Sequence, residues 1–196
     1  DETILGHRPF WVIADHLTRA GIGVLRVDDR GVGGSSKVSL GDTTLELVTD
    51  VEAGVEFLRG HPRVDKRAVW LIGHSEGGMI APMVAANDRR LAGIVCLAGP
   101  AVSGADILVE QNRLLRGAAG VDKKTLDWFM PLFQETIDLV LANPSDATDA
   151  TFIENRKALV AKHMKSAPVL IKLAAAQINT EIEAIGKQLS SPWMRY

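Results

Sequence analysis

Apolar residues in the first hundred positions recur at two spacings, one typical of helices and one typical of buried strands. Residues 9–20 place apolar side chains at helical spacing, and a glycine follows where a helix C-cap is expected. Residues 44–58 repeat this spacing, with Thr43 or Thr44 as the N-cap and a Gly-His-Pro stop at 60–62. The core-facing positions predicted for this second helix are Leu45, Val48, Val51, Val55 and Leu58.

Short, almost wholly apolar runs lie between the helical segments and predict strands. These runs are 22–27, 68–72 and 91–97, and a small-residue stretch at 79–87 predicts a further helix. Strands that alternate with helices and carry few polar residues are typical of a parallel sheet covered on both faces. The expected fold class is therefore α/β, and Cys96, the single cysteine, is expected to be a buried strand residue.

The second half of the chain has a different pattern. From about residue 105 to 190 the apolar positions keep a helical spacing and indicate no strand. The helices predicted there are 106–116, 123–141, 149–165 and 169–187, with breaks at 117–122 and 143–146. Trp128, Phe129, Met130 and Phe133 form an apolar cluster, which suits either packing between helices or an acyl-binding pocket.

The candidate chemistry lies between the second predicted strand and the helix after it. The intervening residues are Gly73-His74-Ser75-Glu76-Gly77-Gly78. A serine at the apex of a strand–turn–helix junction, flanked by glycines that leave room for a strained backbone, is typical of a nucleophile elbow. Ser75 also lies at a helix start, where free N–H groups favour developing negative charge. Ser75 is therefore the candidate nucleophile.

Composition and charge remove several other classes of function. The net charge is −2 with both signs interspersed, so neither a nucleic-acid surface nor a basic membrane anchor is expected. The apolar runs are too short to span a bilayer, and the histidines and acids lack metal-ligand spacing. We expect no metal and no cofactor. No signal peptide is visible, but the chain starts with Asp1, so both a cytoplasmic and a secreted or periplasmic location stay open.

These residues together resemble the α/β-hydrolase superfamily, in its serine esterase and serine aminopeptidase-like branch. The resemblance rests on the helix with Phe10-Trp11, the strand 22–27, the Asp29-Arg30-Gly31-x-Gly33-x-Ser35 loop and the elbow, in that order. It implies a partial α/β-hydrolase core at 1–103, a helical cap at 104–190 and a return to the core at 191–196. The loop residues Asp29, Arg30, Gly31, Gly33 and Ser35 would have a structural role, as would the elbow glycines Gly73, Gly77 and Gly78.

The resemblance also implies that parts of the fold lie outside this chain. In the family the triad acid and then the histidine follow the serine on later strands, which are not found here. A further strand, expected upstream of residue 1, would lie between 22–27 and 68–72. Unless those two strands pair directly, two rows of backbone groups lack partners. We therefore interpret the chain as the middle of a larger enzyme and expect it to be inactive alone.

The implied reaction is hydrolysis of a small-molecule ester or related acyl compound. Ser75 Oγ would attack the carbonyl, and the backbone N–H of Glu76 would hold the oxyanion. His7, His74 and the Glu76 side chain are candidate pocket residues. His163, with Asp146 or Asp149 upstream, satisfies the order of a triad but lies in the predicted helical part.

Other functions were weighed against hydrolysis. Acyl transfer and thioester cleavage use the same serine, and a non-catalytic interaction protein on a degenerate hydrolase scaffold is a further alternative. A homodimer would cover exposed sheet edges in that case. A dinucleotide-binding loop at 31–36 is excluded because Ser36 stands where the third glycine is needed.

Overall fold

A computed structural model describes residues 3, 6–35, 43–142, 150–173 and 180 of the chain. The chain divides into two compact units, Asp1–Gly99 and Pro100–Tyr196. The assignment of these units to a hydrolase core and a cap stays a prediction.

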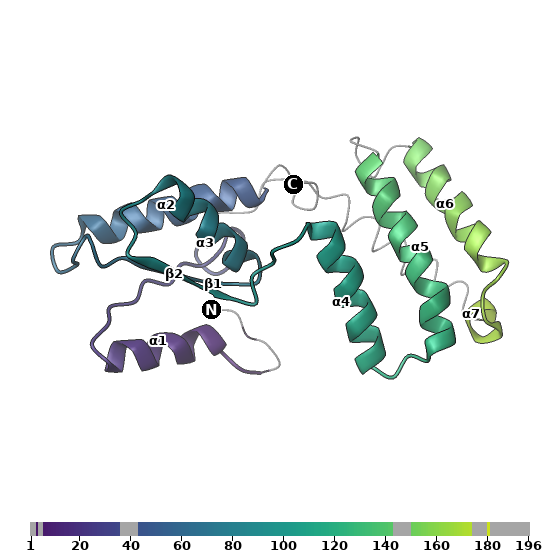
Figure 1. The fold of residues 1–196 in the computed structure, drawn as a ribbon, viewed down its shortest axis with the longest axis horizontal. Coiled ribbons are helices and arrows are strands. Elements are labelled where there is room, and N and C mark those ends of the chain that lie inside the picture. The colour runs from purple at the N-terminus through teal and green to yellow at the C-terminus, as the bar shows by residue number, and fades with distance from the viewer. Residues whose placement is uncertain (1–2, 4–5, 36–42, 143–149, 174–179, 181–196) are drawn as a thin grey trace. The chain divides into compact units, whose positions relative to one another are not determined.

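The first unit is a short parallel sheet with helices (Figure 1). Its elements are α1 (Pro9–Arg19), α2 (Thr44–Gly60), β1 (Trp70–His74), α3 (Glu76–Asn87) and β2 (Gly93–Leu97). The two strands run parallel, with Trp70 opposite Gly93 and His74 opposite Leu97. Helices α2 and α3 pack on each other and α3 packs on both strands. The α/β class is confirmed, as an incomplete sheet.

Local signals explain where the helices begin and end. Thr43 caps α2 in a capping box with Glu46, whose pKa is lowered chiefly by the hydrogen bond from the Thr43 hydroxyl. Helix α2 ends at Gly60, before the predicted His61-Pro62 stop. Helix α1 ends at Arg19, and Gly21 takes a positive φ of 83° as expected for a residue that terminates a helix.

The predicted strand 22–27 is wrong. This segment belongs to no strand, and its large apolar side chains Ile22, Val24, Leu25 and Val27 are exposed. A strand is defined by its ladder of hydrogen bonds, so an apolar β-branched run without an adjacent strand stays irregular. Residues 22–27 do not pair with β1, the strand before Ser75. Such pairing was the condition under which the sequence analysis expected no unpaired strand edges between these two segments.

The predicted coverage of both sheet faces is incomplete in the described part of the chain. Side chains alternate along a strand, so Leu71 faces the small core of Val48, Ile80 and Val84, whereas Trp70 and Ile72 point the other way. Trp70 and Ile72 are 57% and 47% exposed. Helices α2 and α3 therefore cover one face, and the opposite face keeps exposed apolar surface.

Two single-residue expectations fail for related reasons. Cys96 was expected to be buried, but it is exposed on β2, which has a neighbouring strand on one side only among the described residues. Leu45, predicted to face the core, is exposed in the first turn of α2. Val48 and Val55 of the same helix are buried as predicted, and Val51 and Leu58 are half-buried.

The second unit is helical, as predicted. Its elements are α4 (Gly104–Ala118), α5 (Lys123–Ala142), α6 (Ala150–Met164) and α7 (Val169–Leu173). The buried core is made of Trp128, Phe129, Leu132, Phe133, Ile137, Val140, Phe152, Val160 and Ala167. The break at 143–146 and most of the helix predicted beyond residue 173 lie outside the described residues. In the described ranges, no helix is both long and apolar enough to cross a membrane.

Candidate active site

Ser75 lies at the single-residue junction between β1 and α3. Strand β1 ends at His74 and α3 begins at Glu76. Ser75 has φ 53° and ψ −118°, a conformation that is rare for a residue with a side chain and costs on the order of 1–3 kcal/mol. The residue is exposed. A strained, exposed serine at a strand–helix junction is what the predicted nucleophile elbow requires, and residues 73–78 are called the elbow below.

Backbone hydrogen bonds hold this strained turn. The Ser75 N–H donates to the Leu97 carbonyl at 2.9 Å, and the Gly78 N–H donates to the Ser75 carbonyl at 2.9 Å. The first bond extends the β1–β2 ladder by one residue, so the elbow begins at a point fixed by β2. The second closes the turn into the first turn of α3.

The three elbow glycines are not equivalent. A Cβ on Gly73 would overlap the Gly77 carbonyl, and a Cβ on Gly78 would lie 2.6 Å from the Gly99 Cα. Both clashes are with backbone, which cannot rotate away. A Cβ on Gly77 would meet nothing within 4 Å. Close backbone approach therefore requires glycine at 73 and 78, but not at 77.

Glu76 links the elbow to α2. Its carboxylate accepts a hydrogen bond from the Thr44 hydroxyl at 2.8 Å, and Thr44 is only 4% exposed as the first residue of α2. The N-terminal end of a helix favours a carboxylate. From the sequence, the Glu76 side chain could either face a substrate pocket or make a contact within the turn. In the structure the Glu76 side chain, from the first residue of α3, contacts Thr44 of α2. No sequence pattern singled out Thr44 as its partner.

The candidate histidines do not bond to the serine in the described part of the chain, where Ser75 Oγ has no hydrogen-bond partner. His74 is exposed, and its ring lies 5.7 Å from that of Phe10 in α1, tilted by 56°. His7 is exposed just before α1. Phe10 thus ties α1 to the strand end that carries the elbow.

His163 lies in the second unit and bonds to a residue that was not considered for it. Its Nε2 is 3.1 Å from Glu135 Oε1, and its side chain is 11% exposed. Bonds from Lys162 and then His163 lower the pKa of Glu135. Asp146 and Asp149 lie outside the described residues. Because Trp128 Nε1 donates to the His163 carbonyl, the surroundings of His163 are those of the helical core.

The loop at residues 28–35, which precedes α2, is held by hydrogen bonds within the loop and to α2. Ser35 Oγ donates to the Asp28 carbonyl at 2.5 Å, and the Asp29 carbonyl accepts from Val32 N–H at 2.9 Å. Gly31 and Gly33 have φ values of 78° and 54°. A Cβ on Gly33 would overlap the Asp28 carboxylate.

Arg30 connects this loop to α2. Its guanidinium forms two hydrogen bonds to Asp50 of α2, at 2.6 and 2.8 Å, and lowers the pKa of that carboxyl. Arg30 and Asp50 are twenty residues apart, and no pattern in the sequence predicts that they pair. Arg30 therefore holds the loop against the same helix that Glu76 contacts.

The aromatic cluster of the second unit is packing rather than a pocket. Trp128, Phe129 and Phe133 are buried in the helical core, and Met130 packs against it. Their side chains are used for cohesion between helices, so the acyl-pocket interpretation is not supported. Among the described residues, no three histidine, cysteine or acidic side chains are grouped to hold a metal ion.

Comparison with known proteins agrees with this fold class. The sequence profile of the family described as "Serine aminopeptidase, S33" matches residues 10–192. The chain therefore belongs to this family of the α/β-hydrolase superfamily. A curated relative, Esterase EstD of Thermotoga maritima, is 30% identical over 154 residues, which are 74% of this chain and 36% of EstD. The chain thus spans about a third of that relative's length. No solved structure matches the chain significantly.

Proposed function

We propose that this chain carries the nucleophile of a serine hydrolase that cleaves carboxylic esters through an acyl-enzyme on Ser75. The observation that carries the proposal is the backbone of Ser75, with φ 53° and ψ −118° at the junction of β1 and α3. A strain of this kind persists where it serves a site. Family membership and the likeness to Esterase EstD support the reaction class.

The proposed chemistry combines Ser75 and the Glu76 N–H with a histidine base that this chain does not supply. A histidine base takes the Oγ proton while Oγ bonds to the ester carbonyl carbon, and the carbonyl oxygen becomes an oxyanion. The Glu76 N–H, at the start of α3, donates to that oxyanion. Collapse of the intermediate expels the alcohol, which takes the proton from the histidine. Water then repeats the sequence and releases the acid.

The two units have distinct proposed roles. The first unit, Asp1–Gly99, supplies the nucleophile, and the helices of Pro100–Tyr196 form a cap that limits access to it. The triad acid and base, and a second oxyanion donor, come from parts of the protein outside this chain. Removal of one oxyanion donor costs about 2.7–4 kcal/mol. The 196-residue chain alone is therefore expected to turn over no ester.

The test is hydrolysis of short aryl esters by the full natural gene product, with Ser75→Ala as the variant and Ser103→Ala as the matched control. Ser103 is the N-cap of α4. We expect Ser75→Ala to lower kcat by at least about a thousandfold. Ser103→Ala should leave kcat within twofold. Mass spectrometry after a fluorophosphonate probe should find the adduct on Ser75. Unchanged hydrolysis in Ser75→Ala would refute the proposal.

A further inference from the structure

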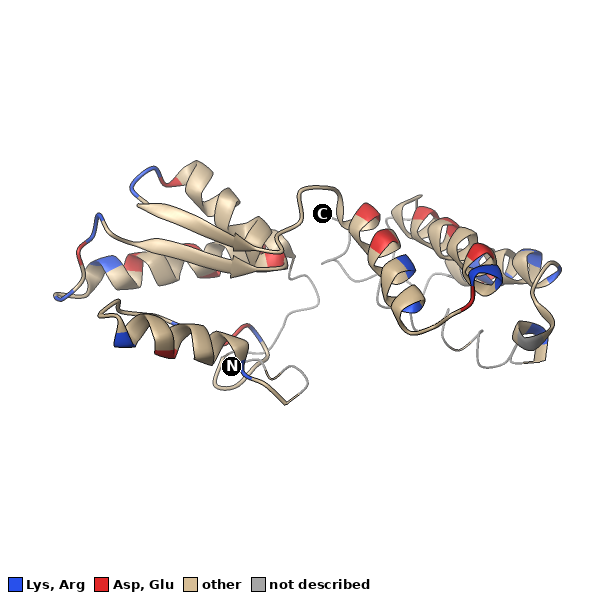
Figure 2. Cartoon of the chain, turned by 60° about the horizontal axis from the view of Figure 1, so that its bottom comes forward, with Lys and Arg blue, Asp and Glu red and all other residues tan. Residues whose placement is uncertain are grey.

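The connections that lead into the two strands gather cations at the end of the sheet opposite the elbow. Lys66 and Arg67 precede β1, and Arg90 precedes β2. Figure 2 shows Lys and Arg on both of these connections. With Arg59, Gly60 and Glu56 of α2 they line a cavity of about 330 Å³. Four steps of a strand span about 13 Å, so this cavity is separate from Ser75.

Arg59 gives this cavity an unusual donor. Its side chain is only 5% exposed, and its Nη1 bonds to Asp88 and, at 2.9 Å, to Glu56. Its Nε and Nη2 are buried and have no hydrogen-bond partner among the described residues. These two nitrogens form one edge of the planar guanidinium, the edge that binds two oxygens of a phosphate or carboxylate at once. A buried donor pair without an acceptor is destabilising, and a bound oxyanion removes that cost.

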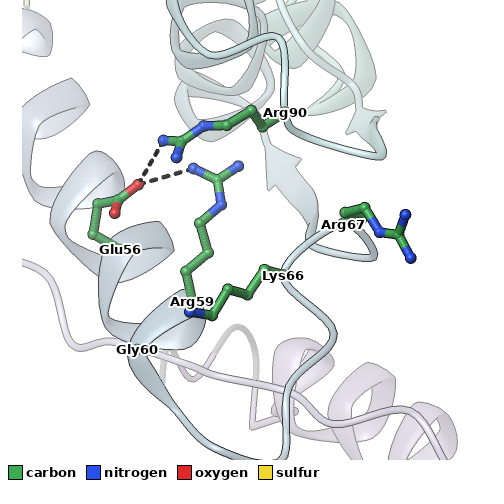
Figure 3. Close-up of a pocket in the computed structure, with 6 residues that line it drawn as sticks. All are labelled: Glu56, Arg59, Gly60, Lys66, Arg67 and Arg90. Carbon is green, nitrogen blue, oxygen red and sulfur yellow. Dashed lines mark hydrogen bonds and ion pairs between the residues drawn. The ribbon is translucent and has the colours of Figure 1, made fainter.

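The neighbouring carboxylates do not bond to this edge. Arg90 bonds to Glu56 at 3.0 Å and to Asp88 at 3.2 Å, so both carboxylates are held near the Nη1 side of Arg59. Asp65 lies 4.0 Å from Arg67, whose side chain is 94% exposed. In the described part of the chain Lys66 has no carboxylate partner. Figure 3 shows the Lys66 side chain beside Arg59 and Gly60, with Arg67 pointing outward.

We propose that Arg59, Lys66, Arg67 and Arg90 form a binding site for a phosphate group, either as free phosphate or as part of a phosphorylated small molecule. Arg59 supplies the paired N–H donors, and Lys66 and Arg67 supply mobile positive charge at the mouth. Because Arg59 Nε and Nη2 are buried, side chains that line the cavity have to move before an oxyanion can reach them. The Glu56 carboxylate competes with phosphate, because it bonds to two of the four cations, Arg59 and Arg90.

The experiment is isothermal titration calorimetry of the full natural gene product with inorganic phosphate and with pyrophosphate, at constant ionic strength set by sodium chloride. We expect saturable one-to-one binding that chloride does not mimic. The double variant Lys66→Gln/Arg67→Gln should weaken binding about tenfold. The matched double variant Arg63→Gln/Arg89→Gln removes two exposed charges nearby that do not line the cavity, and it should bind as the parent does.

The competitor gives a test of opposite sign. Glu56→Gln frees Arg59 and Arg90 from one carboxylate and should tighten phosphate binding several-fold, while the same change at Glu52, outside the cavity, should not. Weaker binding in Glu56→Gln, or no binding by the parent chain, would overturn the proposal. Equal binding by the two double variants would do the same. None of these outcomes depends on esterase activity.

Discussion

The two halves of this molecule bury their apolar residues to different degrees. The helical unit encloses three aromatic side chains of α5 and α6 almost completely: Phe129, Phe133 and Phe152. The sheet-bearing unit has a small core around Val84. Among the described residues, twelve large apolar side chains are exposed in the first unit and six in the second.

The difference follows from how each element satisfies its backbone. A helix pairs its own N–H and C=O groups, so three or four helices with apolar faces complete a core by packing together. A strand depends on partners that are distant in sequence. In the first unit β1 and β2 pair only with each other among the described residues, and the run 22–27, although apolar, remains outside the sheet. The helical unit is thus locally determined, whereas the sheet is not.

Truncation of the helical core should have the largest effect on stability. Phe133 is 2% exposed, and Phe133→Ala should cost about 3–5 kcal/mol because it leaves a cavity between helices. Leu115→Ala, at an exposed position of α4, is the matched control and should change the unfolding free energy by less than about 0.5 kcal/mol. Urea denaturation followed by circular dichroism measures both. Equal losses would mean that the second unit has no specific core.

Substitution of an elbow glycine should have the next largest effect, confined to the first unit. Gly73→Ala drives a Cβ into the Gly77 carbonyl and should cost about 1–3 kcal/mol. Gly77→Ala meets no atom within 4 Å and lies in α3, where alanine is the better helix former, so it should be neutral or slightly stabilising. Amide hydrogen exchange of β1 and α3 distinguishes the two. Loss of protection in Gly77→Ala would show that the turn is packed differently.

Substitution on the exposed sheet face should change the solubility of the protein more than its stability. Ile72→Thr replaces an apolar residue that is half exposed with a β-branched polar one, so the unfolding free energy should change by less than about 1 kcal/mol. Binding of a hydrophobic dye and self-association in light scattering should both fall. The same substitution at Val84, which is fully buried, should instead unfold the first unit. Unchanged dye binding in Ile72→Thr would place the exposed apolar surface elsewhere.

Acid should act on the first unit through Asp88. Hydrogen bonds from Arg59, and then from the Arg90 backbone, hold the pKa of Asp88 well below its ordinary value of 3.8. Because the folded pKa is lowered, this stabilisation is complete above about pH 4 to 5 and is lost as the pH falls further. Asp88→Asn should therefore lower stability at pH 7 and flatten the acid dependence of the first unit. If the unfolding free energy of Asp88→Asn fell with decreasing pH in parallel with that of the parent, other carboxyl groups would be responsible for the acid dependence.

The bounds of α1 and α2 and the strand–turn–helix junction at Ser75 were predictable because their causes are local. The capping box of Thr43 and Glu46, the stop after Gly60 and the glycines around Ser75 all act within a few residues. Burial in the sheet was not predictable in the same way. Cys96 and Trp70 lie in strands as apolar residues should, but their exposure depends on which other segments lie against them. The same holds for contacts between distant residues, such as Arg30 with Asp50 and Glu76 with Thr44.

The sequence by itself determined the helices α1 and α2, the alternation of β1, α3 and β2, the change to an all-helical second half, and Ser75 at a strand–turn–helix junction. These depend on residue periodicity and on glycine, capping and β-branched preferences, which operate over a few residues. Only the tertiary structure decided that Trp70 and Ile72 are about half exposed on one sheet face and that Gly77 has open space where Gly73 has none. It also decided that two nitrogens of the buried Arg59 have no partner within the described ranges. Those properties come from segments far apart in the chain, whose packing no local pattern encodes.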